Sequence, residues 1–225
     1  MLFRSQHAAY VAALRGAGLE VVVLPELAGA PDSCFVEDTA VIAAGMAMLT
    51  RPGAVSRRGE VPSVRDALRG WLPTRTMAAP ATLDGGDVLR VGLDVYVGLS
   101  ARTNVAGVRS LRRAFEPLGL RIHAIELPPS VLHLKCVCSP VDATTVLVAA
   151  GALRAGTFGR ARVIEGPAEE TYAANAVVVH GVALVAAGHP VTQRLLAAEG
   201  LRTVSLDMSE TRKADGSLTC LSLRG

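Results

Sequence analysis

The sequence has no long hydrophobic run. Its most apolar stretch, residues 176–187, carries His180 and Gly181 at its centre and is too short to cross a bilayer. Residues 1–7 also lack a basic segment followed by an unbroken apolar stretch, so no secretory signal is visible. Four cysteines in a chain without such a signal predict reduced thiols rather than disulfides. We therefore expect a cytoplasmic protein that has no membrane among its partners.

The sequence also lacks a strong excess of one charge. It has 23 basic and 20 acidic residues, a net charge of +3, and the two signs are interspersed along the chain. A nucleic-acid-binding protein usually shows a clustered basic excess, so nucleic acid is not expected as a partner. Half of the 225 residues are hydrophobic and 19% are charged, which excludes a disordered chain. The length suits one domain over residues 1–225.

No linker rich in proline, serine or glycine divides the chain, and the sequence is instead repetitive. Five short segments share a form in which polar or charged residues lead into apolar, strand-forming ones; they are residues 35–41, 83–89, 133–138, 174–178 and 218–223. One marker residue in each defines steps of 49, 49, 39 and 45 residues, the length of a compact supersecondary unit; the markers are Asp38, Asp87, Cys136, Asn175 and Cys220.

A second strand, a helix and a third strand are predicted after most of these segments. In the second repeat they are residues 95–99, a helix that begins at Asn104, and residues 121–126. The first repeat has residues 47–50, a helix with apolar positions at Val61, Val64, Leu68 and Trp71, and a weak third segment. The fourth has residues 182–186, 192–199 and 202–206, whereas the helical pattern of the third, near residues 152–158, is poor.

The fifth repeat can be completed only by joining the two ends of the sequence. The chain ends two residues after Leu223, whereas its first residues predict a helix, with Ala8, Val11 and Leu14 on one face, and then a strand over residues 20–24. Joining the ends predicts an α/β protein, a closed five-bladed propeller of ββαβ modules. In this arrangement the N-terminal strand of the closing module is missing, and we expect its unpaired edge to recruit a second chain, giving a homodimer, or to fray.

In such a ring the marker segments lie innermost, so their leading polar residues face a common axis. This places seven side chains in one predicted central site: Glu37, Asp38, Asp84, Asp87, His133, Asn175 and Cys220. A cysteine, a histidine and a carboxylate together are typical of nucleophilic catalysis by a thiolate. The surplus carboxylates favour a planar, cationic small-molecule substrate such as a guanidinium.

At these residues the sequence resembles the dimethylargininases (dimethylarginine dimethylaminohydrolases), a family of the guanidine-modifying, pentein-fold superfamily. The stretches that carry the resemblance span nearly the whole chain in family order and are residues 34–41, 49–58, 82–89, 97–104, 133–135 and 215–220. The resemblance implies the pentein fold and hydrolysis of methylated arginine to citrulline and a methylamine, with no cofactor and no metal.

The resemblance also implies roles for individual residues. Cys220 would be the nucleophile, His133 the general acid and base, and Asp84 the carboxylate that orients His133. The substrate-binding residues would be Glu37 and Asp38 at the guanidinium, Arg57 and Arg102 at the α-carboxylate, and Asp32 at the α-amino group. The pattern of carboxylates in the sequence itself adds Asp87 to the predicted substrate-binding residues. Lys135 stands where arginine deiminases are expected to have an aspartate, which favours an N-methylated substrate.

Three alternatives remain open at this stage. The chain could be an arginine deiminase or another amidinohydrolase. It could also be a catalytically silent pentein, because family members are expected to begin with a strand and a lid loop before the first helix, whereas this sequence begins at the helix. The third alternative is a zinc site formed by Cys220 with the remaining cysteines, for which packing in the interior is the favoured interpretation; these are Cys34, Cys136 and Cys138.

Overall fold

The computed structural model describes residues 2–225, which form two compact units. One unit, here the nucleophile unit, comprises residues 2–23 and Cys136–Leu221. The other, here the carboxylate unit, comprises Leu24–Lys135 and Ser222–Gly225. No described helix is both long enough and apolar enough to cross a membrane. That residues 1–225 form a single domain stays a prediction.

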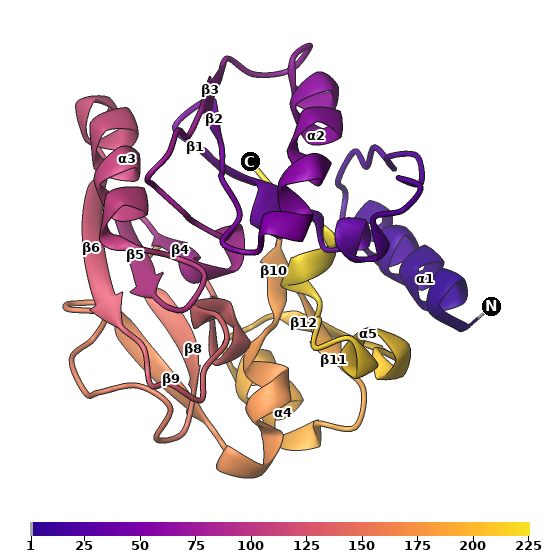
Figure 1. Cartoon of the computed structure of the whole chain (residues 1–225). Helices are drawn as coiled ribbons and strands as arrows, with labels where there is room; N and C mark the ends of the chain where they lie inside the picture. Colours follow the sequence, from indigo (N-terminus) through magenta and orange to yellow (C-terminus); the bar gives the residue numbers. More distant parts are fainter. Residues whose placement is uncertain (1) are drawn as a thin grey trace. The chain divides into compact units, whose positions relative to one another are not determined.

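The carboxylate unit contains two three-stranded sheets of the same design (Figure 1). In each, the first strand pairs antiparallel with the second, and the second pairs parallel with the third after a helical crossover. The first sheet and its helix are β1 (Ala40–Ala43), β2 (Met46–Leu49), α2 (Val61–Leu68) and β3 (Thr74–Thr76). The second sheet and its helix are β4 (Val88–Val91), β5 (Asp94–Leu99), α3 (Val105–Phe115) and β6 (Arg121–Glu126).

The nucleophile unit begins with α1 (Leu2–Gly16) and repeats this strand pairing twice, with turns in place of the helix in its first sheet. Its first sheet is β7 (Cys138–Pro140), β8 (Thr145–Ala149) and β9 (Arg162–Gly166). Its second sheet and helices are β10 (Val177–Val179), β11 (Val182–Ala186), α4 (Pro190–Ala198), β12 (Arg202–Leu206) and α5 (Ser209–Lys213). Four of the five predicted modules are therefore present as three-stranded sheets.

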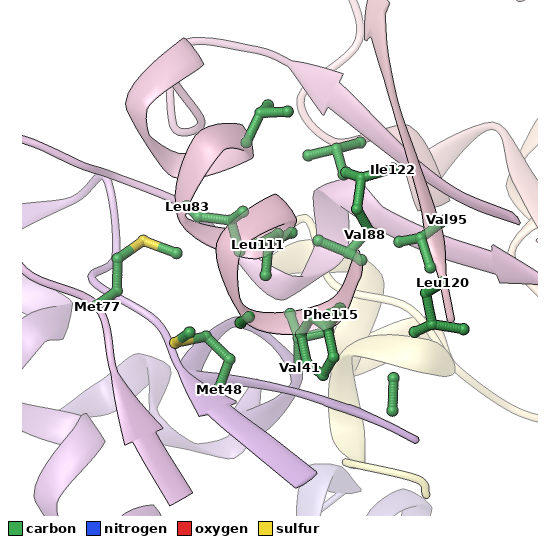
Figure 2. Close-up of a cluster of buried hydrophobic side chains, with 14 of the residues drawn as sticks. Val41, Met48, Met77, Leu83, Val88, Val95, Leu111, Phe115, Leu120 and Ile122 are labelled. Carbon is green, nitrogen blue, oxygen red and sulfur yellow. The ribbon is translucent and has the colours of Figure 1, made fainter. Parts of the chain in front are cut away.

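The sequence around α3 explains why this module forms. Asn104 caps the helix, because its side-chain oxygen accepts a hydrogen bond from the backbone N–H of Gly107 at 2.8 Å. The apolar positions Val108, Leu111 and Phe115 are buried in the largest described cluster of the carboxylate unit (Figure 2). The nucleophile unit has its own cluster, in which Leu196 of α4 packs with Leu147 of β8 and Val185 of β11. Each helix thus covers its sheet with one apolar face.

Three predictions about local structure are wrong. The polar leading residues of the marker segments do not lie in strands but in 3₁₀ turns just before them, such as Val36–Thr39 and Gly85–Asp87. Residues 20–24 form no strand, since no strand among residues 2–225 pairs with them, and Val22 and Val23 are 59% and 51% exposed. Residues 152–158 form turns rather than a helix, as their poor pattern suggests.

The other predicted elements match the structure to within a few residues. The predicted helix in the first module ends at Leu68, which leaves Trp71 exposed beyond it. The last four residues, Ser222–Gly225, complete the carboxylate unit (Figure 1). Leu223 packs with Leu49 and Val64, and Gly225 lies so close to Ile42 that a Cβ on it would be 2.4 Å from the Ile42 side chain.

Candidate active site

His133 and Asp84 form the centre of the candidate site in the carboxylate unit. Nε2 of His133 lies 3.2 Å from Oδ2 of Asp84, and both side chains are buried. The other oxygen of Asp84 accepts a hydrogen bond from the backbone N–H of Gly53 at 2.8 Å. Asp84 directly precedes the 3₁₀ turn Gly85–Asp87, which leads into strand β4. A fixed carboxylate on one ring nitrogen leaves the imidazole oriented for proton transfer.

Asp38 is a second buried carboxylate beside this pair. Its Oδ1 accepts a hydrogen bond from the Gly86 N–H at 2.9 Å, and its Oδ2 accepts one from Nη1 of Arg57 at 2.5 Å. Burial raises the pKa of Asp38, the charge of Asp84 adds to this effect, and the charges of His133 and Arg57 oppose it. Ligand atoms of Asp38, Asp84 and His133 lie within 4.8 Å of one another, a spacing that could also hold a metal ion. This group includes no cysteine.

Arg57 is a buried partner of Asp38. Besides Asp38, its guanidinium donates to both oxygens of Glu60 and to the backbone carbonyls of Asp32 and Phe35. Burial lowers the pKa of Arg57, but hydrogen bonds to Glu60 and the charge of Asp38 outweigh it, so the net shift is upward. The structure therefore gives Arg57 internal partners where the sequence predicts a substrate carboxylate. Sequence reasoning missed Glu60, although its i, i+3 spacing from Arg57 is a signal for such a pair.

Asp87 is fully buried, with an exposed fraction of 0%. Its Oδ2 accepts hydrogen bonds from the hydroxyls of Ser100 and Thr103, both at 2.6 Å, and its Oδ1 accepts one from the Leu134 N–H at 3.0 Å. Burial raises the pKa of Asp87, against the charge of His133 and these hydrogen bonds. The chain itself thus supplies three donors to Asp87, and its predicted contact with substrate stays a prediction.

Glu37 is paired within the chain. Nζ of Lys135 donates to Oε1 of Glu37 at 2.7 Å, and Arg224 from the last four residues lies 3.7 Å from the same oxygen. Both Glu37 and Lys135 are largely buried. The neighbouring carboxylates of Glu37 and Asp38 therefore have different partners. The Lys135 ammonium group pairs with Glu37, whereas the Arg57 guanidinium pairs with Asp38.

Asp32 and Arg102 lie closer to solvent than these groups. Asp32 is exposed in the turn Pro31–Cys34, and Arg102 is half-buried in the loop after β5. Gly53 touches this loop, because a Cβ on Gly53 would be 2.5 Å from both Cα and the carbonyl oxygen of Arg102. Gly53 thus joins the Arg102 loop to Asp84, a role that sequence reasoning missed.

Cys220 lies in the nucleophile unit, in the 3₁₀ turn Thr219–Leu221. Its Sγ accepts a hydrogen bond from the backbone N–H of Ser217 at 3.4 Å. Asn175 grips the neighbouring residue: its side-chain NH₂ donates to the Thr219 hydroxyl at 3.0 Å, and its oxygen accepts from the Thr219 N–H at 2.9 Å. Asn175 and Cys220 are thus held in one unit, and Glu37, Asp38, Asp84, Asp87 and His133 in the other. That all seven converge on one site stays a prediction.

Solved structures define the class of fold. A structure of the dimethylarginine dimethylaminohydrolase from Pseudomonas aeruginosa, a cysteine-to-serine variant complexed with citrulline, matches with a TM-score of 0.94 and 37% identity over 98% of this chain and 87% of that one. The N-terminal domain of ArgZ, a cyanobacterial arginine dihydrolase, matches with a TM-score of 0.89 over 98% of this chain and 85% of that one, but its 18% identity bears on the fold alone. The fold is the pentein fold that the family resemblance implies.

Sequence relatives narrow the class to a family. The family described as "N,N dimethylarginine dimethylhydrolase, eukaryotic" matches residues 2–172. The dimethylarginine dimethylaminohydrolase of Pseudomonas aeruginosa is 38% identical over 97% of this chain and 87% of its own length. The enzyme of the same name from Streptomyces coelicolor is 41% identical over 96% of this chain and 83% of its own length. The chain belongs to the dimethylarginine dimethylaminohydrolase family.

Proposed function

We propose that this protein hydrolyses Nω-methylated arginine, such as dimethylarginine, to citrulline and a methylamine. The observation that carries the proposal is the buried Asp84–His133 pair beside Asp38, in a chain that belongs to this family. The Pseudomonas aeruginosa relative supports it, since a cysteine-to-serine variant of that enzyme is complexed with citrulline.

In the first half of the proposed reaction, the Cys220 thiolate attacks the guanidinium carbon and forms a tetrahedral adduct. The bond from this carbon to the methylated nitrogen then breaks, and His133 gives that nitrogen a proton, so that a neutral methylamine leaves. A covalent amidino-thioester remains on Cys220. Asp84 keeps the protonated imidazole in place through the contact that it already makes with Nε2.

In the second half, His133 takes a proton from water and the resulting hydroxide attacks the same carbon. The carbon–sulfur bond breaks, the hydroxyl of the adduct loses its proton to the released methylamine or to solvent, citrulline leaves, and the Cys220 thiolate is restored. Asp38 would hold the guanidinium beside His133, because ligand atoms of the two residues lie within 4.8 Å of each other and Arg57 and Gly86 fix the orientation of the carboxylate. No other reactant than water is consumed.

The Lys135–Glu37 pair favours a methylated substrate over arginine. An unsubstituted guanidinium presents N–H donors on every side, and its recognition benefits from a carboxylate at each of them. Glu37 is already bound to an ammonium group and offers less acceptor capacity to such a donor. Methyl groups need no hydrogen-bond acceptor, so the Lys135–Glu37 pair does not weaken the binding of a methylated substrate.

At the other end of the substrate, we assign the α-carboxylate to Arg102 and the α-amino group to Asp32. Both lie nearer to solvent than the carboxylates around His133. Arg57 becomes a positioning residue for Asp38 in this assignment, because the chain itself supplies its partners.

Product analysis tests the reaction. The purified protein is incubated with asymmetric dimethylarginine and, separately, with arginine, and citrulline, dimethylamine and ammonia are measured. We expect citrulline and dimethylamine from the first substrate. Ammonia from arginine at a higher kcat/KM would assign an arginine deiminase, and binding of citrulline without turnover of either substrate would assign a silent pentein.

The cysteine nucleophile has its own test. Cys220→Ser replaces an ionisable thiol with an alcohol that stays protonated near neutral pH, so turnover should fall below detection while the circular dichroism spectrum is unchanged. Cys136→Ala is the matched control and should change the melting temperature more than kcat. A folded Cys220→Ser protein that still releases citrulline would overturn this mechanism.

We carry two further expectations with the proposed function, a cytoplasmic location and a homodimer. The exposed segment at Val22 and Val23, for which no pairing strand is described, supports the second of these. Sedimentation of the purified protein measures the oligomeric state directly.

A further inference from the structure

The segment Ala168–Asn175, here the scaffold segment, contacts the loop that leads to Cys220. This loop, Asp215–Cys220, is here the nucleophile loop, and both belong to the nucleophile unit. The hydroxyl of Tyr172 donates a hydrogen bond to the carbonyl of Gly216 at 2.9 Å. Asn175 makes its two hydrogen bonds to Thr219. The scaffold segment therefore grips the loop on both sides of Ser217, whose backbone N–H donates to the sulfur of Cys220.

The scaffold segment is itself held firmly. The carboxylate of Glu170 accepts hydrogen bonds from the backbone N–H groups of Val191 and Thr192, at 3.0 and 2.7 Å, at the start of α4. Burial opposes ionisation of Glu170, yet these hydrogen bonds lower its pKa overall, so it stays charged at neutral pH. The positive end of the α4 dipole also favours this charge. The segment is thus anchored to a helix that takes no part in the predicted site.

Tyr172 is fixed on its ring as well as at its hydroxyl. The guanidinium of Arg212, on α5, lies 4.7 Å from the centre of the ring, and the His189 ring lies 6.0 Å away. Burial raises the pKa of Tyr172, and the charge of Cys220 adds to this effect. The Tyr172 hydroxyl is therefore a protonated donor at any pH at which the protein works.

The nucleophile loop needs such support because its own backbone is unusual. Asp215 has a left-handed conformation, with φ of 57°, and Gly216 donates its N–H to Thr211 at the end of α5. Between Gly216 and Cys220 the loop turns back on itself, and the Ser217 N–H reaches the sulfur three residues later. An N–H that donates to sulfur stabilises the thiolate, which is the reactive form of cysteine.

We propose that Tyr172 and Asn175 are positioning residues for Cys220: they hold the nucleophile loop so that the Ser217 N–H stays on the sulfur. This inference rests on the proposed function for its meaning in turnover, but the reactivity of the thiol tests it without any substrate. The contacts that carry the inference are made with Gly216 and Thr219, so each residue acts on Cys220 through the nucleophile loop.

The experiment measures alkylation of Cys220 by iodoacetamide as a function of pH, with peptide mass spectrometry to separate the four cysteines. Two substitutions are used: Tyr172→Phe, which keeps the ring on Arg212 and removes the hydroxyl, and Thr219→Val, which keeps the shape and removes the acceptor for Asn175. We expect both to slow alkylation about 10-fold near neutral pH and to move its pH profile upward. Thr219→Ser retains the acceptor and should restore the wild-type profile.

Tyr96→Phe is the control, because it removes a phenol hydroxyl in the carboxylate unit, and its profile should match the wild type. With dimethylarginine as substrate, we expect kcat to fall about 10-fold to 100-fold for the two test substitutions, with KM nearly unchanged. A wild type without turnover refutes the proposed function, yet leaves the alkylation result valid.

An alkylation profile that is unchanged in either folded test variant overturns the inference. A lower melting temperature with an unchanged profile does so too, because the contacts would then stabilise the unit without orienting the sulfur. Loss of folding in both test variants while Tyr96→Phe folds also counts against it, for the same reason.

Discussion

At the scale of single residues, the site depends on a glycine. Gly53 donates its N–H to Asp84 and lies against the backbone of Arg102, where a Cβ would meet Cα and the carbonyl oxygen at 2.5 Å. Gly53→Ala must displace one of these backbones. We expect kcat/KM to fall at least ~10-fold, since the shift reaches both the carboxylate on His133 and the predicted carboxylate-binding arginine.

Gly59→Ala is the matched control for this substitution. Gly59 lies nearby in the sequence and a Cβ on it would meet nothing within 4 Å, so the exchange should leave both activity and stability near wild type. Steady-state kinetics and thermal unfolding of the two variants measure these effects on activity and stability. Wild-type kinetics for Gly53→Ala would show that the loop yields without moving Asp84.

The sequence predicts that Arg57 and Arg102 both bind the α-carboxylate of the substrate, and we expect their substitution to have different effects. Arg57→Ala leaves Asp38 and Glu60 as buried carboxylates without their partner, which typically costs about 3–5 kcal/mol of stability and is measured by urea unfolding. Arg102→Ala should leave stability nearly unchanged and weaken binding of dimethylarginine about 30-fold, as expected for a lost contact worth ~2 kcal/mol.

Calorimetry with a simple alkylguanidine, which has no carboxylate, distinguishes these roles. Binding of this ligand should be unaffected by Arg102→Ala. Equal losses for both ligands in the Arg102 variant would mean that this side chain supports the fold. A stable Arg57→Ala protein with a selective loss of dimethylarginine binding would return Arg57 to the role that the family resemblance implies.

At the scale of elements, β5 and β6 are joined by a surface cluster that should respond to acid. Asp94 pairs with Nη2 of Arg121 at 2.6 Å and with His123 at 2.7 Å, and these hydrogen bonds and charges lower its pKa to about 2. A carboxylate whose pKa is lower in the folded state contributes stability above its ordinary value of 3.8 and loses that contribution as the pH falls toward 2.

The difference in unfolding free energy between wild type and Asp94→Asn should therefore be constant above about pH 5 and shrink from there to pH 2. Urea unfolding at several pH values measures it. Asp66→Asn is the control, because Asp66 is an exposed surface partner of Arg65. A difference that stays constant through this range would show that the cluster does not couple to folding.

Elements were predictable where local chemistry alone determines them. The cap at Asn104 and the apolar face of α3 define that helix without any tertiary information. The marker segments were harder, because Asp38 and Asp87 occupy 3₁₀ turns that share the composition of a strand's first residues. Residues 20–24 have strand-forming side chains but no pairing partner among the described residues, and sequence composition cannot supply one.

At the scale of the whole molecule, repetition was the informative signal. It grouped Asp38, Asp84 and His133 although up to 95 residues separate them, and the structure brings these three within 4.8 Å. It could not show which donors of the chain itself each carboxylate binds. Asp87 resembles Asp84 in the sequence, yet its oxygens are occupied by donors from two distant loops. Tyr172 gave no signal at all, because its partner is a backbone carbonyl 44 residues away.

The four C-terminal residues give the molecule an order in time. On a growing chain, Leu24–Lys135 follows the N-terminal part of the nucleophile unit, and all of Cys136–Leu221 must then be made before Ser222–Gly225. Leu223, Arg224 and Gly225 then contact residues that were synthesised much earlier, namely Leu49, Glu37 and Ile42. Until these residues are made, the carboxylate unit lacks the contacts of Leu223 and Gly225, and Glu37 lacks Arg224 among its partners.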